Sequence, residues 1–304
     1  MNFKKNPGRS PWAVFALSFS ISLAILLIIV MVVLTATVSP RRNQAADPGS
    51  EQVAEAFQYE PGVKEAMSVL FISCRQRSDM PFAYTLVRFD PAGDRLILIP
   101  IPPETVTTVG AKTGSFTKHY DYAGSANARL AAESLFLCGV DRYVRIAKSG
   151  AVNLIDALGG LEHRFDTGYE TDAVSVPSGN HLLSGELLYE IAASPPEKAQ
   201  PESWRAGFIQ ELCSQRFREP LIDRLDYLLE VFWNNTDTDI SQFDCTARRR
   251  AMEYFLKSET RTIEVHPLAG TWDKARTVFT PDETAVSELR LILGADEDEE
   301  AFRK

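Results

Sequence analysis

Charged residues that could do chemistry gather where two apolar runs of the chain end. The runs over residues 68–73 and 95–101 are short and rich in Val, Ile, Leu and Phe, so each is expected to form a strand. The charged residues that follow them are Arg75, Arg77, Asp79 and Glu104. Ligands of open α/β sheets bind beyond strand ends, so both ends are expected to contribute to a site.

The chemistry open to these four residues is anion binding and weak metal binding. Arginine suits a phosphate or carboxylate ligand because it donates bidentate hydrogen bonds. Glu104 could hold Mg²⁺, but one carboxylate alone would bind it weakly. Each residue has a plainer interpretation. The three residues after the first run could form a solvated loop, and Glu104 could cap a helix or lie on the surface.

Arg205 is a further candidate, because it follows Trp204 at a predicted helix start. Its guanidinium could contact a phosphate, or it could pair with Glu202 or Glu211 on the same helix. Both interpretations stay open at the level of sequence.

The histidines and cysteines predict no metal or redox centre. His163, His181 and His266 share no ligand spacing, and the chain has no C-x-x-C pair. His119 has no acid or nucleophile placed beside it and is expected to be structural. Most thiols are expected to be buried, although disulfides stay open for an extracellular domain. The cysteines are Cys74, Cys138, Cys213 and Cys245.

The elements expected along the chain alternate as in an α/β fold. Residues 68–73, 84–89 and 95–101 are nearly continuously apolar, which favours central strands covered on both faces. Residues 90–94 have the composition of a hairpin turn. The other expected strands lie at 140–146, 161–165 and 261–266. The expected helices cover 126–137 (ended by Gly139), 149–158, 184–193, 204–218, 221–232, 241–257 and a last segment with its N-cap at Thr280. Residues 166–181 are expected to be a surface excursion. This order predicts one domain with a central mixed sheet and helices on both faces.

The N-terminal region predicts a membrane anchor. Residues 12–38 contain no charge, and residues 12–34 alone would span roughly 34 Å as a helix, enough for the hydrocarbon core. A cleaved signal peptide is the rival interpretation, but its apolar region would be shorter. The basic residues before this segment slightly outnumber those after it, which favours a cytoplasmic N-terminus and an extracellular C-terminal domain at the plasma membrane. The expected divisions are a cytoplasmic segment (1–11), a transmembrane helix (12–38), a linker (39–66), the domain (67–294) and an acidic tail (295–304).

The charge distribution argues against nucleic acid as a partner. The whole chain carries −9 and residues 1–42 carry +5, so the remainder carries −14. A domain that acidic is a poor general binder of a polyanion.

The order of several motifs resembles the LytR-CpsA-Psr proteins of bacterial cell envelopes. The resemblance covers roughly residues 68–293 and the single N-terminal anchor. The matching stretches are VLFIS, LVRFDPAGDRLILIPIPPET, YDYAG (for Y-x-Y-x-G), VDRYVRIAKSGAVNLIDALGGLE, HLLSGELL, RAGFIQEL and VFTPDETAVSEL. No one match is specific, but their order and spacing together are.

The resemblance implies a magnesium-assisted phosphotransferase. It would move anionic glycopolymers from a polyprenyl-pyrophosphate carrier onto peptidoglycan, outside the membrane. Carboxylates would hold Mg²⁺, arginines would bind the pyrophosphate, and an apolar cavity would hold the lipid tail.

The sequence departs from the family pattern where those charges belong. The first acid aligns with Cys74 and the second with Phe82. I-P-R-D-T becomes residues 101–105, with Pro103 in place of the arginine and Glu104 as the remaining acid. The arginines of Y-x-R-x-R are lost at residues 191–195, and R-x-x-R-Q keeps only Arg205.

Three hypotheses follow from these departures. The favoured one is a divergent member with lost or weakened catalysis, a pseudoenzyme that binds a polyprenyl-phosphate lipid or an envelope glycan, or assists an active paralogue. The second is an active enzyme with a rearranged site built from Arg75, Arg77, Asp79, Glu104 and Arg205. Glu104 and Asp79 would be its catalytic candidates, the arginines would bind substrate, and Mg²⁺ would be its cofactor. The third is a ligand-free structural interaction domain.

Overall fold

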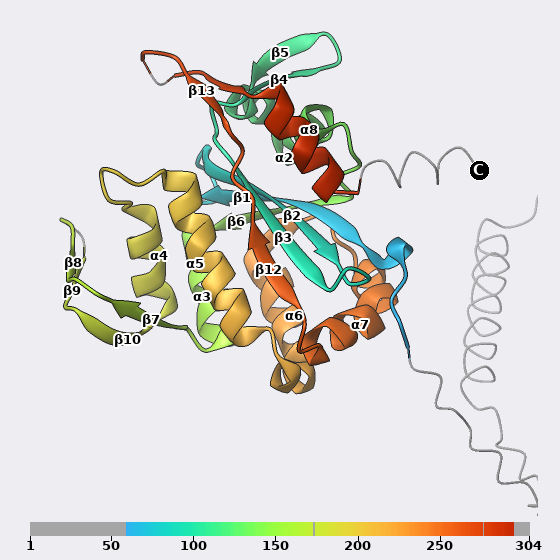
Figure 1. The fold of residues 1–304 in the computed structure, drawn as a ribbon, viewed down its shortest axis with the longest axis vertical. Coiled ribbons are helices and arrows are strands. Elements are labelled where there is room, and N and C mark those ends of the chain that lie inside the picture. Colours follow the sequence, from blue (N-terminus) through green and yellow to red (C-terminus); the bar gives the residue numbers. More distant parts are fainter. Residues whose placement is uncertain (1–58, 173, 276, 295–304) are drawn as a thin grey trace, which may run out of the picture. The chain divides into compact units, whose positions relative to one another are not determined.

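A six-stranded mixed sheet forms the centre of the domain in the computed structural model, which describes residues 59–294 apart from 173 and 276 (Figure 1). Its order is β11-β6-β1-β2-β3-β12. The strands are β1 (Met67–Cys74), β2 (Pro81–Asp90), β3 (Arg95–Ile101), β6 (Arg142–Ala147), β11 (Thr236–Thr238) and β12 (Thr262–Val265). β1 is parallel to β6 and β3 to β12, while the other neighbours are antiparallel. The predicted mixed sheet is therefore confirmed, with β1 to β3 at its centre.

The hairpin between β2 and β3 forms where the sequence predicts it. Asp90 accepts hydrogen bonds from the backbone N–H of Gly93 at 3.0 Å and from Arg95 at 2.7 Å. Asp94 closes the turn in the left-handed region, with φ 54°, which Asp tolerates better than most residues. Every residue of β3 after Arg95 is buried, as expected for a strand covered on both faces.

Helices cover both faces of the sheet, as predicted. The helices are α2 (Phe116–Phe136), α3 (Lys148–Leu158), α4 (Gly185–Ala193), α5 (Pro201–Arg216), α6 (Leu225–Asn235), α7 (Gln242–Lys257) and α8 (Glu283–Ile292), with 3₁₀ turns η1 (Val63–Glu65) and η2 (Glu219–Arg224). On one face α2 and α8 pack on a core that includes Leu70, Leu86 and Ile99. On the other face α5 and α7 bury Leu96, through Cys213 and Phe255.

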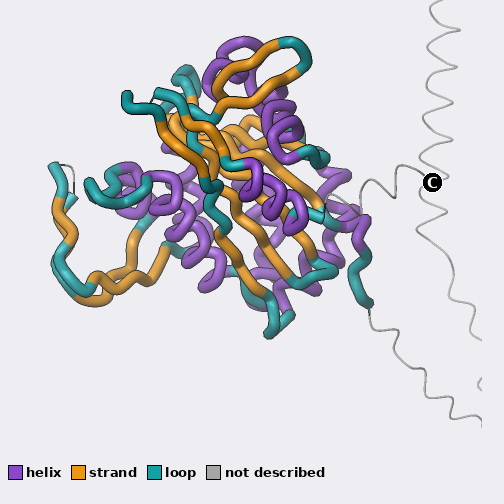
Figure 2. Tube along the Cα trace, turned by 45° about the horizontal axis from the view of Figure 1, so that its top comes forward, coloured by secondary structure: helices purple, strands orange, loops and turns teal. Residues whose placement is uncertain are grey.

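Four two-stranded sheets extend the domain beyond the central sheet (Figure 2). They are β4–β5 (Val106–Val109 and Lys112–Ser115), β7–β10 (Leu161–Phe165 and Gly179–Leu183), β8–β9 (Tyr169–Glu170 and Ser175–Val176) and β13–β14 (Gly270–Trp272 and Phe279–Pro281). β7 has the predicted bounds but pairs only with β10. The excursion over residues 166–181 contains β8, β9 and the start of β10, so it is more regular than predicted.

Several helix ends differ from the sequence prediction; α5 begins at Pro201 instead of Trp204, and α6 begins at Leu225 after the 3₁₀ turn η2 instead of at Leu221. α2 begins at Phe116, ten residues early, and is interrupted at Ala123 and Gly124, where Gly124 has φ 70°. Its C-cap is Leu137, with φ 50°, so the predicted C-cap at Gly139 is wrong. α8 has its N-cap at Asp282, because Thr280 and Pro281 are taken up by pairing in β14. At α8, the pairing of Pro281 with Gly270 displaced the local helix-start signal.

The predicted membrane segment at 12–38, most of the linker and the acidic tail lie outside the described residues. Within the part of the chain that is described, no helix combines the length and the apolar character that crossing a bilayer requires.

Candidate functional site

The ends of β1 and β2 bring Cys74 and Phe82 together. Cys74 faces Pro81 across the two strands, after a register shift between Ser73 and Cys74. Cys74 is 1% exposed, whereas Phe82 is half-buried. The two positions where the resemblance expects carboxylates therefore form an uncharged corner of the sheet.

Two arginines lie against the Phe82 ring. The guanidinium carbon of Arg205, from α5, is 5.1 Å from the ring centroid, and that of Arg75 is 5.8 Å away. Tyr189, from α4, packs edge-on against the same ring at 6.5 Å. Residues from β1, β2, α4 and α5 thus meet at one point, and the cations are held there by ring faces.

Arg205 is largely buried and poorly paired. Its closest acid is Glu202, at 3.9 Å, which is too long for a hydrogen bond. Glu211 instead bonds His163 at 2.7 Å. The Nε and Nη1 atoms of Arg205 are buried without a hydrogen-bond partner in the structure. Burial lowers the pKa of Arg205, and Glu202 opposes this shift.

Glu104 lies close to the same arginine. It is half-buried in the loop between β3 and β4, rather than fully on the surface. Burial raises the pKa of its carboxyl, its own backbone N–H lowers it, Glu202 adds to the rise and Arg205 opposes it. The outcome is a carboxyl that is held nearer to its neutral form than an exposed glutamate.

The loop after β1 separates its three candidate residues. Asp79 turns back on the loop, where its carboxylate accepts the backbone N–H of Gln76 at 3.0 Å. Arg75 and Arg77 are exposed, and neither has an acid within ion-pair distance among the described residues. The structure therefore brings Arg75 and Arg77 to the site and gives Asp79 a role in the turn.

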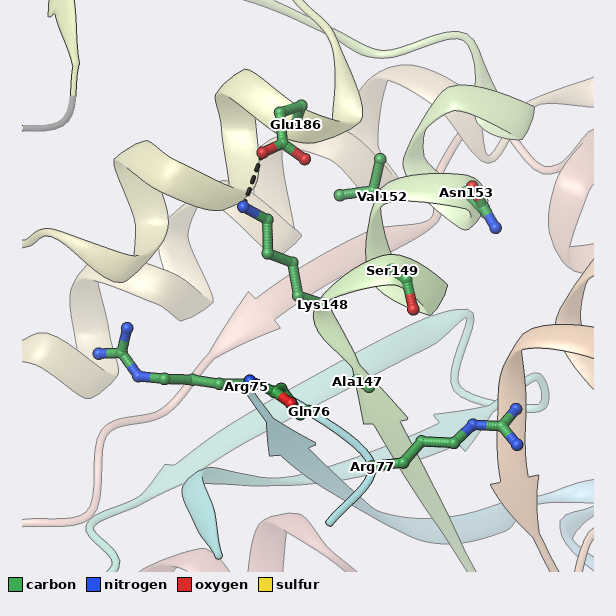
Figure 3. Close-up of a pocket in the computed structure, with 9 residues that line it drawn as sticks. All are labelled: Arg75, Gln76, Arg77, Ala147, Lys148, Ser149, Val152, Asn153 and Glu186. Atoms are coloured by element: carbon green, nitrogen blue, oxygen red, sulfur yellow. Dashed lines mark ion pairs between the residues drawn. The ribbon is translucent and has the colours of Figure 1, made fainter. Parts of the chain in front are cut away.

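A cleft of about 560 Å³ opens beside these arginines (Figure 3). It lies between the loop after β1 and the first turns of α3 and α4. Seven of its nine lining residues are polar or charged; the nine are Arg75, Gln76, Arg77, Ala147, Lys148, Ser149, Val152, Asn153 and Glu186. A cleft with this lining suits a charged headgroup or a glycan better than an isoprenoid tail.

Sequence reasoning missed three charged or aromatic residues of this region. Lys148 pairs with Glu186 at 2.6 Å, drawn in Figure 3, and with Glu190. These two hydrogen-bonded carboxylates raise the pKa of Lys148. Arg145, on β6, donates to the Arg77 carbonyl and lies beside Cys74. Burial raises the pKa of the Cys74 thiol, and Arg145 opposes it.

The missed residues are Arg145, Lys148 and Tyr189, whereas Glu202 was named as a possible partner of Arg205. A usable signal existed for two of them. Arg145 and Lys148 lie at the end of β6, which runs parallel to β1, so their side chains had to reach the same edge of the sheet.

The donor set does not fit a magnesium ion. Among the described residues no three His, Cys, Asp or Glu side chains come close enough to hold a metal. The corner positions are a thiol and a phenyl ring, neither of which is an oxygen ligand of the kind Mg²⁺ requires. Glu104 is the one carboxyl left on the family's pattern, and an arginine already faces it.

Comparison with known families places the chain. The LytR_cpsA_psr family matches residues 41–293. The chain belongs to this family. It is 23% identical over 237 residues to a protein of Bacillus subtilis (strain 168) named polyisoprenyl-teichoic acid–peptidoglycan teichoic acid transferase TagU, covering 74% of this chain and 76% of the relative.

Solved structures share the fold at low identity. A protein of Eubacterium siraeum, described as a putative transcription regulator, has a TM-score of 0.71 at 19% identity, covering 84% of this chain and all of that one. B. subtilis TagV has a TM-score of 0.63 at 18% identity, covering 76% and 96%. TagT bound to LIIa-WTA has a TM-score of 0.59 at 16% identity, covering 82% and 98%. The chain is thus a LytR_cpsA_psr protein related to teichoic acid–peptidoglycan transferases.

Proposed function

We propose that this protein binds a phosphate-bearing envelope glycan, linked to a polyisoprenyl carrier, without transferring it. One observation carries the proposal. The corner where the family pattern has two carboxylates holds Cys74 and Phe82, yet Arg75 and Arg205 remain beside it. The site has arginines that can bind an anion and lacks the carboxylates that would support its transfer.

The physical basis is the difference between binding and turnover. Arginine holds a phosphate through charge-assisted hydrogen bonds whether or not any bond breaks. Phosphoryl transfer further requires charge neutralisation and a group that orients the attacking hydroxyl. Of the described acids near the corner, Glu104 has a pKa that burial raises, which disfavours its charged form, and Glu186 is engaged by Lys148.

The relatives support the ligand class. TagU is named as a transferase of polyisoprenyl-linked teichoic acid to peptidoglycan, and TagT is described bound to LIIa-WTA. We extend this to a related, phosphate-bearing cell-wall polymer as the ligand of this chain. An active paralogue that performs the transfer is the proposed partner.

The proposed location is the outer face of the plasma membrane. The uncharged stretch 12–38 is the proposed anchor, with the domain on the outside. The full chain is then expected to stay in the membrane fraction after a carbonate wash. A variant lacking residues 12–38 should be released, and an unchanged distribution would contradict the anchor.

A second candidate function is a weakened transferase. The observation that favours it is Glu104, a half-buried carboxyl whose pKa is raised by burial, as is common for a group that exchanges a proton during catalysis. A ligand-free interaction domain is the third candidate. It is disfavoured by Arg75 and Arg77, which line the cleft and have no acid within ion-pair distance among the described residues.

One experiment separates the three candidates. The full chain, purified in detergent, is titrated with farnesyl pyrophosphate and with inorganic pyrophosphate, and phosphate release is followed with magnesium present. Saturable binding without release supports the proposal. Release that Glu104→Ala reduces indicates an enzyme, and no saturable binding indicates a structural domain. Tighter binding of the farnesyl compound would show that the isoprenoid contributes, whereas equal affinities would assign recognition to the phosphates.

A further inference from the structure

The unmet hydrogen-bonding capacity around the corner is largely donor capacity. The buried Nε and Nη1 of Arg205 and the buried Nε of Arg145 have no partner in the structure. Guanidinium nitrogens only donate. The hydroxyls of Tyr84 and Tyr189 are also buried without a partner and can serve as donors.

Unpaired buried donors lower the stability of the folded protein, so their chemistry indicates which kind of ligand the site would bind. A buried polar group without a partner costs stability. Oxygen atoms of an anion would satisfy these donors, whereas a divalent cation offers no acceptor and would be repelled by the guanidiniums. The local demand is therefore for an oxyanion and not for a metal.

The Phe82 ring explains how two cations can stay together without a carboxylate between them. Arg75 and Arg205 each lie within 6 Å of its centroid, the range in which a ring face attracts a cation. Their mutual repulsion contributes to lowering the pKa of Arg205. A bound oxyanion would relieve that repulsion, and the ring would hold both guanidiniums in place before it arrives.

We propose that Arg75, Phe82 and Arg205 form a phosphate-oxyanion receptor that works without a divalent metal ion. This inference rests on the proposed function, since it concerns the same ligand. It departs from the family's magnesium chemistry, and it assigns Phe82 a positioning role in place of the acid.

The test is a binding titration of the full chain with farnesyl pyrophosphate, in magnesium and in EDTA. Wild-type affinity is expected to be the same in both. Phe82→Leu keeps an apolar side chain but removes the ring face, and it should weaken binding about tenfold in EDTA, equivalent to about 1.4 kcal/mol. Phe243→Leu is the matched control, because Phe243 is 78% exposed on α7; it should leave affinity unchanged.

A second variant gives a readout that a merely structural role would not move. Phe82→Asp places a carboxylate beside the two arginines, where it should pair with them and weaken anion binding in both buffers by more than the neutral Phe82→Asn does. Arg205→Met, which keeps much of the aliphatic volume, should weaken binding in both buffers, so the inference does not depend on the folding of the Phe82 variants.

Three outcomes overturn the inference. Loss of wild-type binding in EDTA would refute metal independence while leaving the proposed binding function standing. Unchanged affinity in a folded Phe82→Leu variant would refute the role of the ring. Absence of saturable binding in both buffers would refute the proposed function itself.

Discussion

We expect the ion pair between Arg142 and Asp244 to contribute strongly to the packing of α7 on β6, and replacing Asp244 with Asn tests this. Arg142 donates to both carboxylate oxygens at 3.0 Å. Asp244 also accepts from the backbone N–H and the hydroxyl of Ser241, at 2.9 and 2.7 Å, within the predicted capping box. β6 contains Arg145 and is followed directly by Lys148, so this ion pair also helps to position the site.

The expected magnitude follows from the pKa of Asp244. Burial alone would raise it, but the hydrogen bonds from Arg142 and Ser241 outweigh burial and lower the pKa from 3.8 to about 2. A depressed pKa of this size corresponds to about 2 kcal/mol of folding stability at neutral pH. Asp244→Asn should lower the melting temperature by about 4–8 °C in a domain of this size.

The depressed pKa also determines how the stabilising contribution of Asp244 changes with pH. Because the folded state depresses the pKa, the contribution is complete above the unfolded value of 3.8 and is lost as pH falls through about 2. The gap between wild type and Asp244→Asn should therefore be widest near pH 7 and should shrink between pH 4 and pH 2.

The assay is thermal unfolding of the full chain in detergent, followed by tryptophan fluorescence at several pH values. Asp226→Asn is the matched control, since Asp226 also bonds an arginine, Arg249, but is exposed; its loss should barely change the midpoint. An Asp244→Asn gap that stayed constant from pH 7 to pH 2.5 would refute the electrostatic reasoning.

Three further predictions concern the helices and the thiols around the site. Gly185→Ala should destabilise the domain, because its Cβ would come within 2.3 Å of a backbone carbonyl of α3. The control Gly207→Ala, on α5, has open space around its Cβ and should stabilise the domain by about 0.5–1 kcal/mol. Chemical unfolding measures both variants, and equal effects would contradict the close approach of α3 and α4. Lys148→Met should weaken pyrophosphate binding severalfold, because Glu186 and Glu190 on α4 would lose the ammonium group that neutralises them and would repel the anion. An unchanged dissociation constant for pyrophosphate would place the anion elsewhere. Cys74 and Cys213 should resist a thiol-specific reagent at pH 8 until the chain is unfolded. The reason is that burial raises the pKa of both thiols, that of Cys213 to about 12. Labelling is counted by mass spectrometry, and fast labelling of the folded chain would disprove their burial.

Much of the scaffold could be predicted because its signals are local. Continuous apolar runs marked β1, β2 and β3, and turn residues marked the hairpin between the last two. Ser241 and Asp244 marked the start of α7 by a side-chain pattern that forms within one turn. Most thiols are expected to be buried, and three of the four cysteines, Cys74, Cys138 and Cys213, are buried in apolar clusters.

Local signals failed where a distant contact decided the outcome. β7 reads as a strand of the main sheet, but its partner is β10, and only the tertiary path of the chain makes that pairing. Pro281 reads as the first turn of a helix, but pairing with Gly270 places it in β14. A pairing partner many residues away leaves no mark in the segment itself.

The sequence by itself determined the family and the loss of charge at the site. Motif order identified a LytR_cpsA_psr protein, and residue identity placed Cys74 and Phe82 where carboxylates were expected. Both are properties of the linear chain.

Only the tertiary structure decided what replaced those carboxylates. Arg75 and Arg205 are 130 positions apart in the chain, and both lie on the Phe82 ring because β1 ends where β2 and α5 begin. The same convergence buries guanidinium donors without acceptors, which no residue pattern could reveal, because hydrogen-bond satisfaction depends on every neighbour in space.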